Sequence, residues 1–185
     1  MSGEMFTQDL RRNSVTWKLF DVAAFADRNN MTVAELNTTN DRLGFDITCV
    51  LDEDTTTFTL GSSELDTRLS FCDGVGVSRP GQINPELTLS AYRDADRNAD
   101  GVFKKVFDWL RHADQEYILV QRVGDQDSGP TGSTPAAPYT VADDIRAMAF
   151  RTDYPVDTLA QGDPAMLAQT GLTAGWISWN EKPKP

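Results

Sequence analysis

A strand–helix–strand succession between Pro85 and Val123 constrains the fold of this chain more than any other stretch. Apolar and polar residues alternate from Leu87 to Tyr92, which is the period of a half-buried strand. The β-branched, apolar run from Glu116 to Val123 predicts a second strand. Between them, five apolar residues recur at spacings that place them on one face of a helix: Val102, Phe103, Val106, Phe107 and Leu110. We therefore expect an amphipathic helix packed against a mainly β body.

Short strand-like segments separated by turn residues fill most of the remaining chain. Thr32 to Glu35 has the form of a capping box and predicts only one short helical turn. Gly171 to Gly175 separates the last two predicted strands. The further strand-like stretches are 15–20, 45–51, 55–60, 65–71, 139–154, 165–170 and 175–180. About eight strands with one amphipathic helix packed against them predict a mainly β (α+β) fold, arranged as a β-sandwich or barrel.

The chain length of 185 residues suits a single domain with extended ends. Residues 1–14 are polar and aperiodic, so we expect an N-terminal arm, followed by one domain over 15–180. Ten of the fifteen residues in 124–138 are Gly, Pro, Ser or Thr, which predicts a mobile loop with a binding role. Residues 181–185 form a polar C-terminal tail containing two prolines.

The charge balance argues against a protein that grips nucleic acid. Seventeen basic residues stand against 28 acidic ones, a net charge of −11, and no basic cluster exceeds a pair. No run approaches the ~20 apolar residues that a bilayer requires, and the first residues lack the features of a signal peptide. Cys49 and Cys72 lie in strand-like runs, so we expect buried free thiols rather than a disulfide.

The acidic connection before the helix resembles the beginning of a calcium-binding loop. Asp96, Asn98 and Asp100 supply oxygen ligands at alternate positions, and Gly101 follows at the sixth. The closing carboxylate is missing, however, because Phe107 occupies the twelfth position. We interpret the stretch as an acidic cap, in which Asn98 or Asp100 caps the helix N-terminus, and we predict no metal or cofactor.

Catalytic constellations have little support in the sequence. The single histidine, His112, lies near the end of the predicted helix, where a cationic side chain commonly has a structural role. No serine lies in a nucleophile-elbow motif, and the pair Asp143-Asp144 is typical of a solvated turn. We therefore predict that the protein is not an enzyme.

The order of its segments gives the chain a family resemblance over about residues 15–180. The stretches that carry it are Val33–Leu36, Asp46–Val50, Phe71–Gly74, Ser78–Gly81, Leu87–Tyr92, Tyr117–Gly124 and Arg151–Pro155. In this order they resemble the major tail tube proteins of long-tailed, siphovirus-type bacteriophages, particularly phages of actinobacteria.

The resemblance implies a structural virion protein that self-assembles into six-membered rings, which stack into the tail tube. DNA would pass through this tube during ejection without specific binding. Six copies with a charge of −11 amount to −66 per ring, and acidic residues lining the bore would repel the DNA. The implied partners are other copies of the chain, the tape measure protein, the tail terminator and distal tail proteins. The implied location is the virion tail, assembled in the host cytoplasm, with no membrane involved.

Ring stacking in that family uses loops and terminal arms, which correspond here to 1–14, 124–138 and 175–185. The candidate self-assembly residues are Trp17, Asp125, Asp127, Pro130, Pro135, Tyr139, Trp176 and Trp179. Two other functions stay open at this point. One is a β-sandwich interaction or decoration module of a virion, and the other is a calcium-binding module that uses the Asp94–Asp100 loop.

Overall fold

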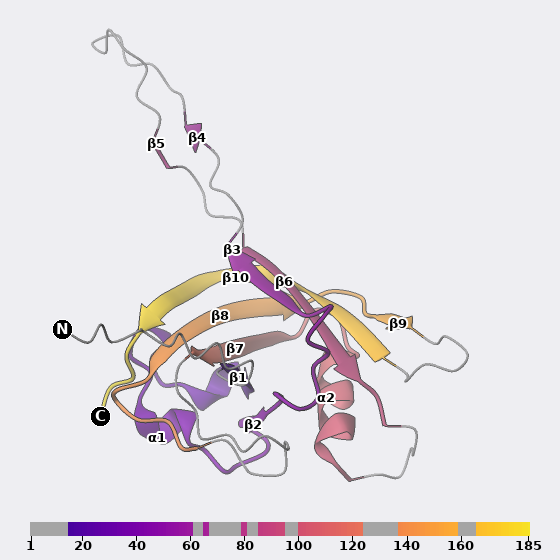
Figure 1. Ribbon diagram of the computed structural model, residues 1–185, viewed down its shortest axis with the longest axis horizontal. Helices are drawn as coiled ribbons and strands as arrows, with labels where there is room; N and C mark the ends of the chain where they lie inside the picture. The colour runs from indigo at the N-terminus through magenta and orange to yellow at the C-terminus, as the bar shows by residue number, and fades with distance from the viewer. Residues whose placement is uncertain are drawn as a thin grey trace, which may run out of the picture. The chain divides into compact units, whose positions relative to one another are not determined.

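The computed structural model describes residues 15–60, 65–66, 79–80, 85–94, 100–123, 137–158 and 166–185 (Figure 1). The strands within them are β1 (Val15–Asp21), β2 (Gly44–Asp46), β3 (Thr57–Leu60), β4 (Leu65–Asp66), β5 (Arg79–Pro80), β6 (Pro85–Tyr92), β7 (Glu116–Val123), β8 (Asp144–Thr152), β9 (Val156–Thr158) and β10 (Met166–Glu181). The α-helices are α1 (Val33–Leu36) and α2 (Val102–Leu110), and two 3-10 turns cover Val22–Ala24 and Arg28–Asn30.

Eight of the described strands form one antiparallel sheet in the order β2-β1-β7-β8-β10-β6-β3, with β9 also paired to β10. β4 and β5 pair with each other in a separate two-stranded sheet. The prediction of a mainly β fold with an amphipathic helix is therefore confirmed. No helix in the described ranges combines the length and the apolar character that crossing a bilayer requires.

The chain folds into two compact units. The first unit comprises Met1–Cys49, Tyr117–Ala149 and Trp176–Pro185, and the second comprises Val50–Glu116 and Phe150–Gly175. Each unit has its own buried side chains, so we describe the two separately.

In the first unit, β1 lies between β2 and β7. Leu19 is opposite Phe45 on one side and Leu119 on the other, and it is fully buried. Three consecutive β7 residues, Ile118, Leu119 and Val120, are also fully buried. Because successive strand residues point to opposite faces, β7 is covered on both faces, which explains its continuous apolar sequence.

The predicted short helical turn and its capping box are confirmed in α1. The Thr32 hydroxyl accepts from the Glu35 backbone N–H, and the Glu35 carboxylate accepts from the Thr32 backbone N–H. The C-terminal tail lies against the same residues. The Lys184 backbone N–H donates to Met31, and the Lys184 carbonyl accepts from Val33, at 2.8 and 2.9 Å.

In the second unit, β6 lies between β3 and β10, and α2 packs on β6 (Figure 1). Val106 and Leu110 of α2 are fully buried, whereas Phe103 and Phe107 are only half-buried. Val102 is also only half-buried, so two of the five apolar residues on this helix face lie in the core. The Arg93 guanidinium lies 4.2 Å from the centroid of the Phe107 ring, a cation–π contact.

The pair β4–β5 continues the register of β3–β6. Leu60 pairs with Pro85, and Leu65, five residues further along, pairs with Pro80, five residues further back. The intervening stretches are therefore equal in length, with four residues between β3 and β4 and four between β5 and β6.

Several predicted strands are wrong in extent, among them the one expected over 139–154, which is confined to β8 (Asp144–Thr152). The strand expected over 45–51 ends at Asp46, whose carboxylate accepts from the Thr48 backbone N–H and turns the chain. The strands expected over 165–170 and 175–180 are one 16-residue strand, β10. Gly171 lies inside this strand. A Cβ atom there would lie 2.5 Å from the Leu87 side chain, so the close packing of Leu87 favours glycine at this position. Gly175 adopts a φ of 82°, which favours glycine, within the strand.

Two smaller predictions are also corrected. The N-cap of α2 is Gly101, without a side-chain hydrogen bond, so Asp100 does not cap the helix. Asn98 lies outside the described residues. Cys49 is exposed rather than buried, and Cys72 lies outside the described residues.

We predict that Leu110→Ala lowers the free energy of unfolding by about 3 kcal/mol, because it leaves a cavity between α2 and the sheet. Phe103→Ala, on the same helix at a half-buried position, should cost less than Leu110→Ala. Urea unfolding of the two variants measures the difference. Equal losses would show that α2 does not pack through Leu110.

We also predict that the capping box makes stability depend on acid pH. Burial raises the pKa of Glu35, but hydrogen bonds from the Ala26 and Thr32 N–H groups and the Thr32 hydroxyl outweigh it, so the pKa lies below 4.5. The stabilisation is therefore fully present above the unfolded-state value and is lost as the pH falls through the folded-state pKa. Melting curves between about pH 6 and 3 should show a shallower acid loss for Glu35→Gln than for wild type. The exposed-site variant Glu53→Gln is the control, and a slope like that of Glu35→Gln there would contradict the assignment.

Candidate functional site

Two of the segments predicted to stack rings are joined to the β1–β7 pair at the same end. Val15, the first residue of β1, is directly opposite Val123, the last residue of β7. Residues 1–14 therefore precede the sheet, and residues 124–136 follow it, at one strand end. The C-terminal tail reaches the neighbouring turn, because the Lys182 ammonium donates to the Ala142 carbonyl at 3.0 Å.

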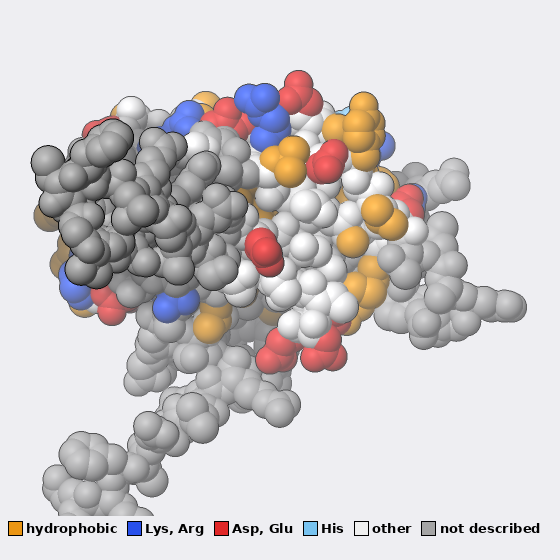
Figure 2. Space-filling view, turned by 90° about the horizontal axis from the view of Figure 1, so that it is seen from above, with side chains coloured by type: hydrophobic (Ala, Val, Ile, Leu, Met, Phe, Trp, Pro, Cys, Tyr) orange, Lys and Arg blue, Asp and Glu red, His pale blue; other side chains and the backbone are white. Residues whose placement is uncertain are grey.

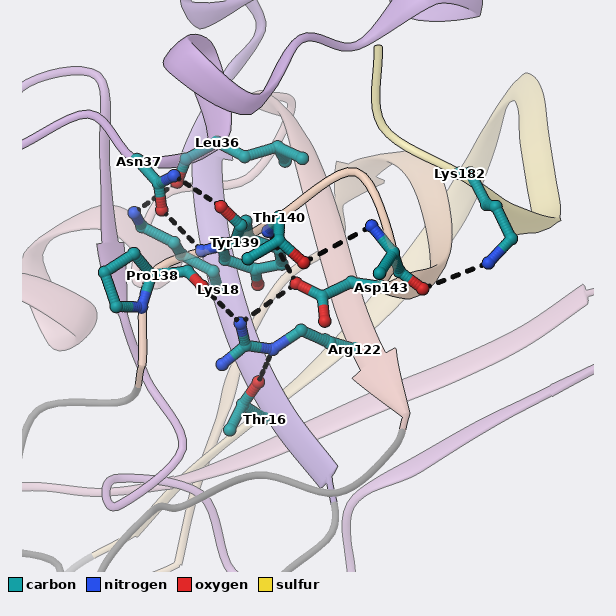
Figure 3. Close-up of polar contacts among 11 residues, drawn as sticks. Thr16, Lys18, Leu36, Asn37, Arg122, Pro138, Tyr139, Thr140, Asp143 and Lys182 are labelled. Atoms are coloured by element: carbon teal, nitrogen blue, oxygen red, sulfur yellow. Dashed lines mark hydrogen bonds and ion pairs between the residues drawn. The ribbon is translucent and has the colours of Figure 1, made fainter. Parts of the chain in front are cut away.

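A buried arginine joins the two ends of the 124–138 segment (Figure 3). The Arg122 side chain is 1% exposed, and its Nη1 donates to the carbonyl of Pro138 at 3.2 Å. Nη1 also lies 3.3 Å from the Asp143 carboxylate, and Nε donates to the Thr16 hydroxyl at 3.3 Å. The guanidinium lies over the Tyr139 ring, 4.4 Å from its centroid. We call these five residues the Arg122 network.

Burial makes these contacts energetically important. A guanidinium removed from water is strongly destabilising unless it is paired and hydrogen-bonded. Asp143 supplies the opposite charge, and the Tyr139 ring supplies a cation–π contact. Nη2 is buried without a hydrogen-bond partner in the described part of the chain, so the remaining contacts must hold the group. Losing any of them should weaken the attachment of residues 137–143 to β7.

Asn37 fixes Tyr139 from the other side. Its amide accepts from the Tyr139 backbone N–H at 2.7 Å and donates to the Tyr139 carbonyl at 2.8 Å. The Tyr139 side chain is buried, and this burial raises the pKa of its hydroxyl. Both backbone groups of Tyr139 are therefore satisfied by one side chain at the end of α1.

Lys18 adds a second, partly buried cation to this region. Its ammonium donates to the carbonyls of Leu36 and Thr38, at 2.6 and 3.4 Å. Burial lowers the pKa of Lys18, Asp46 raises it in part, and Arg122 lowers it further by repulsion. The carbonyl of Leu36 belongs to the last residue of α1, where a positive charge is favourable.

A turn that ends at Asp143 adds further contacts to the Arg122 network. The Asp143 carboxylate accepts from the Thr140 backbone N–H at 2.7 Å while it pairs with Arg122. Asp144, by contrast, is exposed and lies 3.5 Å from the ammonium of Lys182. The interpretation of Asp143-Asp144 as a solvated turn therefore holds for Asp144 and is wrong for Asp143.

The structure places four of the eight candidate self-assembly residues in the first unit. Trp17 is half-buried on β1, opposite Gln121 of β7, and Tyr139 is buried in the Arg122 network. Trp176 and Trp179 belong to β10. The other four, Asp125, Asp127, Pro130 and Pro135, lie outside the described residues.

The candidate metal ligands are not brought together in the described ranges. Asp100 is exposed beside the N-cap of α2, and Asp96 and Asn98 lie outside those ranges. No group of three or more His, Cys, Asp or Glu side chains suited to a metal occurs among the described residues. His112 is exposed, and its backbone carbonyl accepts from the Thr152 hydroxyl at 2.7 Å.

Sequence reasoning missed Arg122, Asn37 and Asp143. The only signal for Arg122 was a charged residue within a β-branched, apolar strand. Asn37 carried no local signal for its contact with Tyr139, 102 residues away. Asp143 carried only the signal of a turn, which its bond to Thr140 confirms, and its pairing with Arg122 is 21 residues away.

We predict that Arg122→Met lowers the free energy of unfolding by about 3 kcal/mol, because it leaves the Asp143 carboxylate without its buried partner. The cost lies at the low end for buried pairs, since the Asp143 side chain is 18% exposed. Lys182→Met removes an exposed cation that contacts the same turn from the C-terminal tail, and it should cost under ~0.5 kcal/mol. Urea unfolding compares the two variants, and similar losses would exclude Arg122 as the anchor.

A comparison with known families now identifies the chain's relationship. A family described as phage tail tube protein matches residues 8–178. No curated protein matches the chain. Since the match covers most of the sequence, the chain belongs to the phage tail tube protein family, which is a family of structural proteins of the virion tail.

Proposed function

We propose that this phage tail tube protein forms six-membered rings that stack into the tube through which DNA is ejected. Family membership supports self-association in a tail. We infer the hexameric rings, their stacking and the passage of DNA from the resemblance of the sequence to the tail tube proteins of long-tailed phages of actinobacteria.

The observation that supports ring stacking is the pairing of Val15 with Val123. Val15 directly follows residues 1–14, and Val123 directly precedes residues 124–136, so both segments join the sheet at one strand end. Arg122, which lies just before the second segment, donates to the carbonyl of Pro138, which lies just after it. Contacts formed by either segment with a neighbouring ring would therefore be transmitted to the same rigid strand pair.

Ring closure would use the strands at the ends of the sheet order. β2 and β3 occupy these positions. Edge strands of a sheet readily pair with another chain, and pairing around a closed ring leaves no exposed edge. A contact that repeats along the axis does not close, so stacking continues until another protein terminates it.

The remaining partners and locations follow from this tube. The tape measure protein, tail terminator and distal tail proteins would contact its interior and its two ends. Assembly would take place in the host cytoplasm, and DNA would pass without specific binding. The net charge of −11 per chain is consistent with a tube that does not retain a polyanion.

The test is electron microscopy of the purified chain together with a variant in which a short Gly-Ser linker replaces residues 125–135. Wild type should form tubes, and the variant should form rings that stack poorly, while its melting temperature stays close to wild type. A substitution at an exposed site outside the segment, Thr39→Ala, should leave the tubes unchanged. Wild-type monomers that persist at high concentration would exclude the tube and favour a decoration module.

A further inference from the structure

The C-terminal tail pairs with residues 31–33 as a short parallel strand. Both pairing groups of the tail belong to Lys184, whose backbone N–H donates to the Met31 carbonyl at 2.8 Å and whose carbonyl accepts from the Val33 N–H at 2.9 Å. The preceding residue, Pro183, is buried. The tail is therefore docked on the first unit by its backbone.

Residues 31–33 have pairing groups on two sides. One side is filled from within the chain, because Thr32 and Glu35 form the capping box of α1. On the other side lie the Met31 carbonyl and the Val33 N–H, which is the first N–H of α1 and has no partner inside the helix. Without Lys184, these two groups would form a short open edge to which another chain could add a strand.

The outer edge of the tail differs from its inner edge in hydrogen-bonding capacity. In an extended strand, the N–H and C=O of one residue point to one edge, and those of the next residue point to the opposite edge. Lys184 directs both groups inward, so Pro183 and Pro185 direct theirs outward. Proline has no backbone N–H. An incoming strand would therefore meet no N–H donor at either position, and its own carbonyls would stay unpaired there.

Charge alone does not close this edge. Lys184 is exposed, and like charges would oppose the pairing of two identical tails. The whole chain carries a net charge of −11, however, and Figure 2 shows acidic side chains at several separate places on one face. A strand that bears lysines attracts such surfaces of a second copy. The missing N–H donors oppose strand pairing whatever the charge of the incoming segment.

We propose that residues 182–185 form an edge cap. The edge cap pairs with Met31 and Val33 on its inner side, and its two prolines prevent a second copy of the chain from adding a strand on its outer side. This inference does not rest on the proposed tube. It assigns residues 182–185 a role within their own chain, distinct from the ring stacking predicted for 175–185. If rings form, the edge cap removes a competitor of the sheet edges at β2 and β3.

The test restores the missing donors. The double variant Pro183→Ala/Pro185→Ala gains two outward N–H groups and keeps the inward pairing of Lys184. Sedimentation velocity of the freshly purified full chain measures self-association, at concentrations below those at which wild type assembles. Wild type should stay monomeric, and the association constant of the double variant should be at least about tenfold higher, because two backbone hydrogen bonds become available.

Two further variants keep the result interpretable. Pro185→Ala, at an exposed position, should raise association less but in the same direction, and it decides the test if loss of the buried Pro183 lowers the melting temperature. Lys184→Thr removes the exposed charge, retains both prolines and should stay monomeric. Association of Lys184→Thr as strong as that of the double variant would overturn the inference, because charge would then close the edge. Alanine variants that melt and sediment like wild type would overturn it as well.

Discussion

The first unit depends on how one buried cation is satisfied. A guanidinium that is 1% exposed must be hydrogen-bonded and paired, and no single neighbour of Arg122 can do this alone. Thr16, Pro138, Tyr139 and Asp143 come from the first strand and from the segment that precedes β8. Because these groups are required together, the chain is fixed on both sides of residues 124–136. Burial of this charge therefore holds Thr16, Pro138 and Asp143 at the end of β7.

The second unit uses polarity differently. Its helix is held by Leu110 and Val106 in the core and by the Gln169 amide at the helix C-terminus. Arg93 and Arg111 lie against the Phe107 ring of this helix.

Local patterns predicted the elements that local interactions determine. The period of β6, the apolar run of β7, the helical spacing of α2 and the capping box of α1 are all contained in short windows. The end of β2 has a local cause, the turn between Asp46 and Thr48, and a distant one, because the Thr48 hydroxyl accepts from the Trp17 backbone N–H 31 residues away. Only the second lies beyond a short sequence window. The continuity of β10 depends on Leu87, which fills the space where Gly171 has no side chain. For the site, the sequence indicated Tyr139 and the 124–138 segment, but Arg122, Asn37 and Asp143 become meaningful only through partners distant in sequence.

The shared register of β3–β6 and β4–β5 limits how this protein can change during evolution. Because Leu60 pairs with Pro85 and Leu65 pairs with Pro80, the stretches 61–64 and 81–84 are equal in length. A single-residue insertion in 61–64 alone would move Leu65 and Asp66 to the opposite face of the β4–β5 pair, unless a bulge absorbed the extra residue. Relatives of this chain should therefore differ by matched insertions or deletions in 61–64 and 81–84, and most readily by two residues in each stretch. The separation of β4–β5 from β3–β6 along the chain would then change by two residues at a time, and the two faces of β4–β5 would not be exchanged.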